Sequence, residues 1–229
     1  MTPRAIIFDL DDTLYPERRF IISGLRAVAD GVERTFGVPA DAAFSHMRRE
    51  LAAGRREVPL QSLCVNFKLD PLIIPALVSL IRGHQPQLRI ARSTRRLLRG
   101  LRHQWCLGIL TNGDPAVQAR KIRALGLEPL VDGVIYAAQH GDGGGKPDGA
   151  CFRAAASTLG VSASRCVFVG NDETRDVDGA RRAGMAAIHL HARRSTSPAA
   201  RNADAVVRRL IDVPYAATQL VPGELLWCA

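Results

Sequence analysis

The 229-residue sequence predicts an α/β fold, a doubly wound parallel sheet that carries an inserted all-helical unit. From Ser93 to Leu190 helical patterns alternate with short apolar runs, and strands separated by helices form parallel sheets covered on both faces. The stretch 15–88 interrupts this alternation, because it reads as consecutive amphipathic helices. We therefore expect an α/β core made of residues 1–14 and 89–229, with residues 15–88 as a separate helical domain.

The core begins with a short apolar strand, Ala5–Phe8, that leads directly into Asp9 and Asp11. Alternate residues of a strand point to the same face, so we expect the two carboxylates to share one crevice. Two like charges this close favour a bound cation, and Mg²⁺ suits oxygen ligands. The plainer alternative is an acidic turn in which Thr13 acts as a cap.

The inserted stretch predicts four helices. Apolar stripes mark the first three, at 25–36, 44–51 and 60–67, and Asp70-Pro71 is a typical start for the fourth, Leu72–Ile81. Pro75 is expected to shorten or kink that helix. These stripes predict the packing of a helix bundle rather than a ligand site.

A second apolar strand, Cys106–Leu110, ends in Thr111-Asn112-Gly113. This end offers a hydroxyl, an amide and a residue that is free to turn. Such a group can hydrogen-bond a phosphate oxygen. The helix after it is expected from Pro115 to Leu125 and to end at Gly126. Towards the end of the chain, a last helix is expected over Ala203–Ile211.

A glycine-rich loop, 141–145, delivers Lys146 to the start of the next helix. The chain has 31 lysines and arginines, and only three of these are lysine. If any cationic side chain were sufficient at this position, we would therefore expect arginine. The compact lysine ammonium can neutralise one phosphoryl oxygen or a carboxylate where a planar guanidinium does not fit. The alternative is a surface lysine at a junction between a loop and a helix.

A further strand, Cys166–Val169, runs into Gly170-Asn171-Asp172-Glu173-Thr174-Arg175-Asp176. Asp172 and Asp176 are four residues apart, so in a helical turn their side chains fall on one face and can converge on a cation. Glu173 is better explained as an acid that complements the helix dipole.

In this order the segments DLDDT, LTNG, GKPD and GNDETRD resemble the four motifs of the haloacid dehalogenase-like phosphohydrolases. The resemblance implies a Rossmann-like core, and it implies that the helical insertion is a cap that closes over the active site. It further implies that Asp9 is the nucleophile and Asp11 the general acid/base. By the same resemblance, the residues that bind the phosphate of the substrate are Thr111, Asn112, Gly113 and Lys146. Lys146 also neutralises the negative charge of that phosphate.

The resemblance also implies that Mg²⁺ is bound by the Asp9 side chain, the Asp11 backbone carbonyl and the acids of the last motif. Here the sequence departs from the usual Gly-Asp, because Asn171 follows Gly170. Two registers remain, in which either Asp172 or Asn171 joins Asp176 as a ligand. We favour Asp172, since a carboxylate binds a hard cation better than a carboxamide does.

These features predict a Mg²⁺-dependent phosphomonoester hydrolase that acts on a small phosphorylated metabolite through an aspartyl-phosphate. The acid at Asp11 favours phosphate esters, because dehalogenases that resemble this fold lack it. Two alternatives stay open, a phosphotransferase or mutase of the same fold, and a binding module that has lost catalysis.

The formal net charge of +9 raises nucleic acid as a partner, and arginines line one side of the expected helix at 92–102. No aromatic residues are interleaved with them, so we expect a solvated face and no nucleic-acid partner. No apolar run reaches the roughly 20 residues that span a bilayer, and no leader pattern is present, so we expect no membrane partner. The five scattered cysteines favour a reducing cytoplasm, and the oligomeric state is not predicted.

Overall fold

The computed structural model describes residues 3–55, 58–142, 144–191 and 199–223. The chain forms two compact units, Met1–Pro16 with Arg89–Ala229, and Glu17–Leu88. The first unit contains the sheet, and the described elements of the second are all helical. Across the described ranges, no helix is both long and apolar enough to cross a membrane.

The sheet has six parallel strands in the order β3-β2-β1-β4-β5-β6. The strands are β1 (Ala5–Phe8), β2 (Cys106–Thr111), β3 (Gly133–Tyr136), β4 (Cys166–Gly170), β5 (Ala186–Leu190) and β6 (Ala205–Val207). In the middle of the sheet, Ala5 of β1 pairs with Cys106 on one side and with Cys166 on the other. All four β1 side chains are fully buried, as expected for an apolar strand in a sheet covered on both faces.

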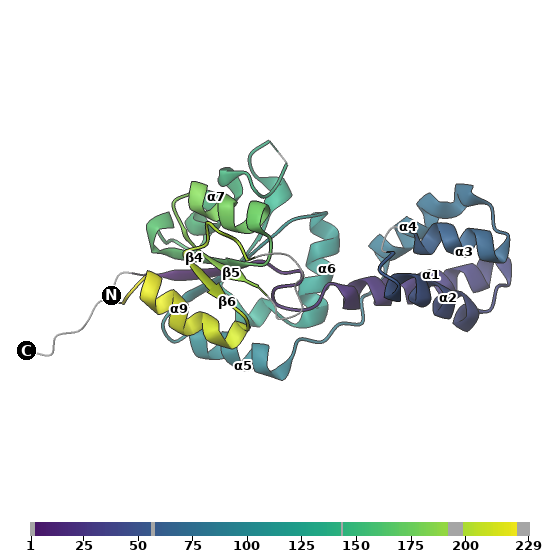
Figure 1. Ribbon diagram of the computed structural model, residues 1–229, viewed down its shortest axis with the longest axis horizontal. Coiled ribbons are helices and arrows are strands. Elements are labelled where there is room, and N and C mark those ends of the chain that lie inside the picture. The colour runs from purple at the N-terminus through teal and green to yellow at the C-terminus, as the bar shows by residue number, and fades with distance from the viewer. Residues whose placement is uncertain (1–2, 56–57, 143, 192–198, 224–229) are drawn as a thin grey trace, which may run out of the picture. The chain divides into compact units, whose positions relative to one another are not determined.

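Helices cover both faces of this sheet, which confirms the α/β class (Figure 1). They are α5 (Arg92–Leu101), α6 (Pro115–Leu125), α7 (Gly149–Thr158), α8 (Gly179–Arg182) and α9 (Val213–Leu220). Helix α7 lies on one face, where Phe152 packs against Phe168 of β4 with ring centroids 5.0 Å apart. Helices α5 and α9 lie on the other face. The strand order reverses beside β1, and sheets of this kind bind ligands beyond the strand ends at such a point.

The second unit contains α1 (Arg18–Phe36), α2 (Ala40–Ala52), α3 (Pro59–Phe67) and α4 (Ile74–Gly83). Its core is formed by the apolar stripes of these helices, including Leu25, Val28, Val32, Met47, Leu63 and Leu77. The fourth helix starts later than expected, after a 3₁₀ turn at Pro71–Ile73. Proline has no N–H to donate and fits the first turn of a helix, so α4 begins beside Pro75 instead of passing through it.

The expected helix over Ala203–Ile211 is wrong. Its centre forms the edge strand β6, which pairs in parallel with β5. Consecutive valines favour a strand, and the Asp204 carboxylate accepts a hydrogen bond from the Ala187 backbone N–H where the pairing starts. The last helix, α9, begins only at Val213. Most of the polar stretch after His191, and the last residues of the chain, lie outside the described residues.

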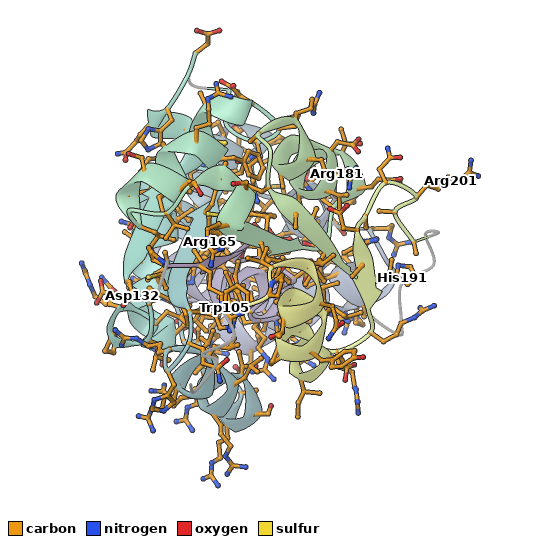
Figure 2. All side chains as sticks on the ribbon, turned by 90° about the vertical axis from the view of Figure 1, so that its left-hand side faces the viewer. Trp105, Asp132, Arg165, Arg181, His191 and Arg201 are labelled. Carbon is orange, nitrogen blue, oxygen red and sulfur yellow. The ribbon has the colours of Figure 1, made fainter. Side chains whose placement is uncertain are left out.

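The amino-terminal edge of the sheet is held by contacts around Trp105, which is labelled in Figure 2 and directly precedes β2. The Arg4 guanidinium lies 4.0 Å from the centre of the Trp105 ring and donates to the Val221 carbonyl at 2.9 Å. These contacts tie the segment after α9 to the sheet. They lie at the opposite end of the strands from Asp9, so this edge supports the fold and leaves the carboxyl ends for chemistry.

Candidate active site

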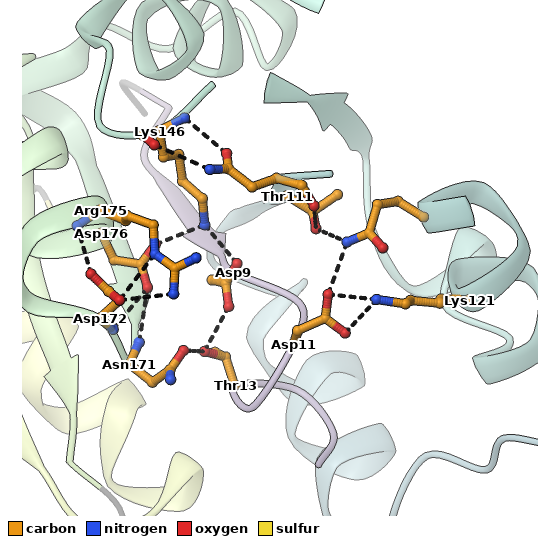
Figure 3. Close-up of polar contacts among 12 residues, drawn as sticks. Asp9, Asp11, Thr13, Thr111, Lys121, Lys146, Asn171, Asp172, Arg175 and Asp176 are labelled. Carbon is orange, nitrogen blue, oxygen red and sulfur yellow. Dashed lines mark hydrogen bonds and ion pairs between the residues drawn. The ribbon is translucent and has the colours of Figure 1, made fainter. Parts of the chain in front are cut away.

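Four segments meet at the carboxyl ends of the central strands (Figure 3). Asp9 directly follows β1, Thr111 is the last residue of β2, and Gly170 is the last residue of β4. The loop between β3 and α7 brings Lys146 to the same place. Segments far apart in the sequence converge here because parallel strands present all their carboxyl ends at one edge of a sheet.

Lys146 joins two buried carboxylates. Its Nζ lies 2.6 Å from Oδ1 of Asp9 and 2.7 Å from Oδ1 of Asp176. The exposed fractions of the three side chains are 3% for Lys146, 9% for Asp9 and 3% for Asp176. Charges are buried to this extent only when they are paired. One ammonium between two carboxylates leaves an excess of negative charge, which suits a further cation.

Burial also changes the ionisation of this group. It raises the pKa of Asp9 to about 6; the Lys146 ammonium opposes this rise, and the Asp176 carboxylate adds to it. For Lys146, burial favours the neutral amine, but the attraction of Asp9 and Asp176 outweighs it and raises the pKa. At neutral pH, Lys146 is therefore an ammonium and Asp9 a carboxylate.

Asn112 holds the loop that delivers Lys146. Its Oδ1 accepts a hydrogen bond from the Lys146 backbone N–H at 2.8 Å, and its Nδ2 donates to the Lys146 carbonyl at 3.1 Å. Gly145 has a φ of 72°, and a Cβ there would lie 2.8 Å from Asn112 Oδ1, so the approach requires glycine. Asn112, predicted as a phosphate ligand, thus has its side chain bonded to the lysine loop, and its neighbour Gly113 is exposed.

Asp11 points into a second group of polar side chains. Lys121 Nζ lies 2.9 Å from its Oδ1 and 2.8 Å from its Oδ2. The Tyr15 hydroxyl donates to Oδ1 at 2.5 Å. Figure 3 shows Asp11 facing Lys121 while Asp9 faces Lys146. The two carboxylates at the end of β1 therefore have different cationic partners.

Thr111 belongs to the same group through Gln118 of α6. The Gln118 amide Nε2 donates to Asp11 Oδ2 at 2.9 Å and also to the Thr111 hydroxyl. Thr111 and Gln118 are almost fully buried. The predicted phosphate-binding residue and the predicted acid/base are thus linked by one side chain of α6.

Sequence reasoning missed Gln118 and Lys121. Lys121 is one of only three lysines in the chain, and it follows Gln118 by three residues on the helix that starts just after Thr111-Asn112-Gly113. Residues three apart share a face of a helix. Two long polar side chains on one face, beginning beside a predicted site, were the available signal.

In the last motif, Asp176 is fixed by the backbone as well as by Lys146. Its Oδ2 accepts hydrogen bonds from the backbone N–H groups of Asn171 and Asp172, both at 3.0 Å. A Cβ on Gly170 would overlap the Asp176 side chain, which explains the glycine at the end of β4. The segment Glu173–Asp178 forms a π-helical turn.

The two candidate ligands of the last motif lie in different surroundings. The Asn171 Oδ1 accepts a hydrogen bond from the Thr13 hydroxyl at 3.3 Å, and the same hydroxyl lies 3.1 Å from Asp9 Oδ2. The Asp172 carboxylate instead binds the Arg175 guanidinium at 2.8 and 3.0 Å. Burial opposes ionisation of Asp172, but the Arg175 backbone N–H and guanidinium outweigh it and hold the pKa of that carboxyl below its usual range.

The donor types at this edge suit Mg²⁺. Asp9 and Asp176 offer carboxylate oxygens, Asn171 offers a carboxamide oxygen, and Asp11 offers its backbone carbonyl, all hard ligands. Within the described ranges, no three or more His, Cys, Asp or Glu side chains are grouped so as to hold a metal ion. Two carboxylates together with amide and carbonyl oxygens form a donor set that Mg²⁺ accepts. The negative charge around Lys146 fits such an ion.

The fold and the site together define an α/β enzyme whose carboxylate and lysine centre lies at the switch point of a parallel sheet. The family model of haloacid dehalogenase-like hydrolases matches residues 3–184. The chain belongs to this family, which confirms the resemblance drawn from its four motifs.

Several proteins of the family that are similar to this chain are named phosphatases. The chain is 28% identical over 222 residues to a glyceraldehyde 3-phosphate phosphatase of Methanopyrus kandleri, covering 92% of this chain and 94% of that protein. It is 31% identical over 199 residues to a phosphoglycolate phosphatase of Xanthomonas campestris, covering 81% and 82%. A crystal structure of a phosphatase of this family from Thermococcus onnurineus matches with a TM-score of 0.62 and 27% identity, covering 96% of this chain and 99% of that one.

Proposed function

We propose that the chain is a Mg²⁺-dependent phosphatase that hydrolyses a small phosphomonoester through an aspartyl-phosphate intermediate. The observation that carries this proposal is the buried Asp9 carboxylate at the end of the central strand, with Oδ1 on Lys146 and Oδ2 on Thr13. A carboxylate so held can act as a nucleophile and split one difficult displacement into two easier ones.

In the first step, an Asp9 oxygen forms a bond to phosphorus while the ester P–O bond breaks. Asp11, in its acid form, gives its proton to the departing oxygen, so the product leaves as an alcohol. Lys146 and the Thr111 hydroxyl lie at the same edge and would offset the negative charge of the transferring phosphoryl group. The products of this step are the free alcohol and the acyl phosphate on Asp9.

In the second step, Asp11, now a carboxylate, takes a proton from water as the water oxygen attacks phosphorus. The bond between phosphorus and the Asp9 oxygen breaks, which releases inorganic phosphate and restores both aspartates. A bound Mg²⁺ would supply further stabilisation of the phosphoryl oxygens. It would be held by the Asp9 and Asp176 carboxylates, the Asp11 carbonyl and one residue of the last motif.

For that last ligand the contacts favour Asn171 over Asp172, because Asn171 Oδ1 and Asp9 Oδ2 contact the same Thr13 hydroxyl, whereas the Asp172 carboxylate is paired with the Arg175 guanidinium. We expect Asn171→Asp to tighten the Kd for Mg²⁺ about tenfold, since a carboxylate replaces a carboxamide on a hard cation. Asp172→Asn should change that Kd by less than about twofold. Calorimetric titration with Mg²⁺ alone decides between them, and the opposite pattern would assign the ligand to Asp172.

The substrate class follows from the relatives, whose names specify glyceraldehyde 3-phosphate and phosphoglycolate. Both are small phosphorylated metabolites, and we propose a substrate of that size. The helical unit Glu17–Leu88 would act as the cap that selects it. The free thiols at Cys64, Cys106, Cys151 and Cys166 are consistent with our proposal of a cytoplasmic enzyme.

Phosphate release from a panel of phosphomonoesters, with Mg²⁺ or with EDTA, tests this proposal. The panel includes phosphoglycolate, glyceraldehyde 3-phosphate, sugar phosphates and nucleoside monophosphates. We expect release that requires Mg²⁺ and is greatest with one of the three-carbon or two-carbon esters. Absence of release from every ester, together with absence of Mg²⁺ binding, would contradict the proposal. Transfer to a second alcohol that outruns release would favour a phosphotransferase.

A further inference from the structure

Helix α6 directs two buried polar side chains at Asp11. Gln118 is 2% exposed as a residue and the Lys121 side chain is 6% exposed, although arginines at neighbouring positions of the same helix reach the surface. The Lys121 ammonium contacts both oxygens of Asp11, at 2.9 and 2.8 Å. Gln118 donates to one of these oxygens and to the Thr111 hydroxyl.

Burial of these groups is costly for a helix that needs only to cover the sheet. Apolar side chains at both positions would pack α6 without desolvating a charge and an amide. The polar contacts of Lys121 and Gln118 are with Asp11, the predicted acid/base, and with Thr111, the predicted phosphate-binding residue. The arrangement is therefore better explained by the orientation of Asp11 than by packing.

The backbone alone does not fix the direction of Asp11. Asp9 and Asp11 are two residues apart beyond a strand, and the rotation of each carboxylate is set by its partners. Lys146 holds Asp9 from one side, and Lys121 holds Asp11 from α6 on the other (Figure 3). Two lysines on different segments thus separate the two carboxylates and give each a defined direction.

We propose that Lys121 and Gln118 are positioning residues that hold the Asp11 carboxylate in the direction from which it transfers protons. Gln118 also fixes the position of this carboxylate relative to the Thr111 hydroxyl. This inference rests on the proposed function, because it assigns a role only if Asp11 exchanges protons with the ester oxygen and with water. Proton transfer depends strongly on such geometry, since a small misplacement of a reacting group lowers the rate by large factors.

The way in which kcat/KM depends on the leaving group of the ester distinguishes a loss of Asp11 positioning from a general loss of structure. An alkyl phosphate leaves as a strongly basic alkoxide and needs a proton, whereas p-nitrophenolate leaves without one. The ratio kcat/KM reports on steps up to the first irreversible one, which include release of the alcohol. A misdirected Asp11 should therefore impair the alkyl ester more than the aryl ester, whereas a loosened fold should impair both equally.

The test compares kcat/KM of the full chain for an alkyl phosphate from the panel and for p-nitrophenyl phosphate. We expect Lys121→Met to lower the alkyl value by about 30-fold to 100-fold and the aryl value by less than about fivefold. Gln118→Leu should show the same direction with a smaller loss. Lys121→Arg, which retains the charge, should lose less than Lys121→Met and is the second variant if methionine impairs folding. Arg123→Met, exposed on the same helix, should leave both values unchanged.

Asp11→Asn serves as the reference, because it removes the acid itself. If Asp11→Asn impairs the alkyl ester selectively but the Lys121 and Gln118 variants impair both esters equally or not at all, the positioning role is wrong and the proposed function stands. If Asp11→Asn impairs both esters equally, the acid role in the proposed function fails, and the positioning role fails with it.

Discussion

Replacement of Lys146 by methionine is expected to lower kcat/KM for every phosphomonoester by a factor of about a thousand or more. The Lys146 ammonium lies within 2.7 Å of carboxylate oxygens of Asp9 and Asp176, and all three side chains are buried. Without it, the negative phosphoryl group would approach two carboxylates with one fewer positive charge. Lys146→Arg should fail similarly, since a planar guanidinium does not fit the space between the two oxygens.

The same replacement should also destabilise the fold in EDTA. Removal of one partner from a buried ion pair leaves an uncompensated charge, which costs about 3 to 5 kcal/mol of unfolding free energy. Urea unfolding measures this loss, and the rates come from phosphate release. Lys68→Met is the matched control, because Lys68 is exposed in the helical unit. A Lys146→Met protein that kept a tenth of the wild-type activity would contradict the role given to this lysine.

Asp9→Asn is expected to abolish phosphate release, because a carboxamide does not form the aspartyl-phosphate. No phosphoryl group should become attached to the variant protein when it is mixed with substrate and quenched in acid. Mass spectrometry of the intact chain measures that adduct in the wild type. Turnover by Asp9→Asn at more than about a thousandth of the wild-type rate would point to a different nucleophile.

The same variant should become more stable relative to the wild type as the pH rises. Burial raises the pKa of Asp9 from 3.8 to about 6, so the folded state binds this proton more tightly than the unfolded state does. The associated stability is present below pH 4 and is lost as the pH rises through 6. The carboxamide of the variant does not titrate and has no such loss, so the difference in unfolding free energy should shift in favour of Asp9→Asn by on the order of 3 kcal/mol across that window. Urea unfolding in EDTA between pH 4 and 8 measures it, and a pH-independent difference would contradict it.

The fold class could be predicted from the sequence because its strands are short apolar runs that alternate with helical patterns. Three of the motifs lie at the end of a strand, the fourth lies in the loop after β3, and parallel strands end together. Asp9, Thr111, Lys146 and Asp176 lie at this one edge of the sheet. The family was predicted from the same segments. The edge strand β6 was not predicted, because its two valines are too short a run to indicate a strand, and its pairing with β5 is not visible in the sequence.

The partners of the site residues were harder to predict than the residues themselves. Gln118 and Lys121 belong to a helix whose rotation against the sheet decides whether they reach Asp11 or the solvent. The Asn112 amide could bind a phosphate oxygen as well as a backbone group. It bonds the Lys146 backbone because of the path that the loop before Lys146 takes, and the sequence does not show this path. For Asp172, the nearby Arg175 is visible in the sequence, but the choice between that guanidinium and a metal depends on the shape of the turn.

The central place of β1 also determines when the enzyme can be completed during its synthesis. The ribosome makes β1 before the other five strands, yet Ala5 pairs with Cys106 and Cys166, and the whole helical unit is made before either. The apolar strand β1 therefore remains unpaired while the helical unit, whose contacts are local in sequence, folds. Asp9, the proposed nucleophile, and Asp176 can both contact Lys146 only after Asp176 has left the ribosome. A nascent chain that stops short of this point therefore exposes β1 and lacks this buried group of charges.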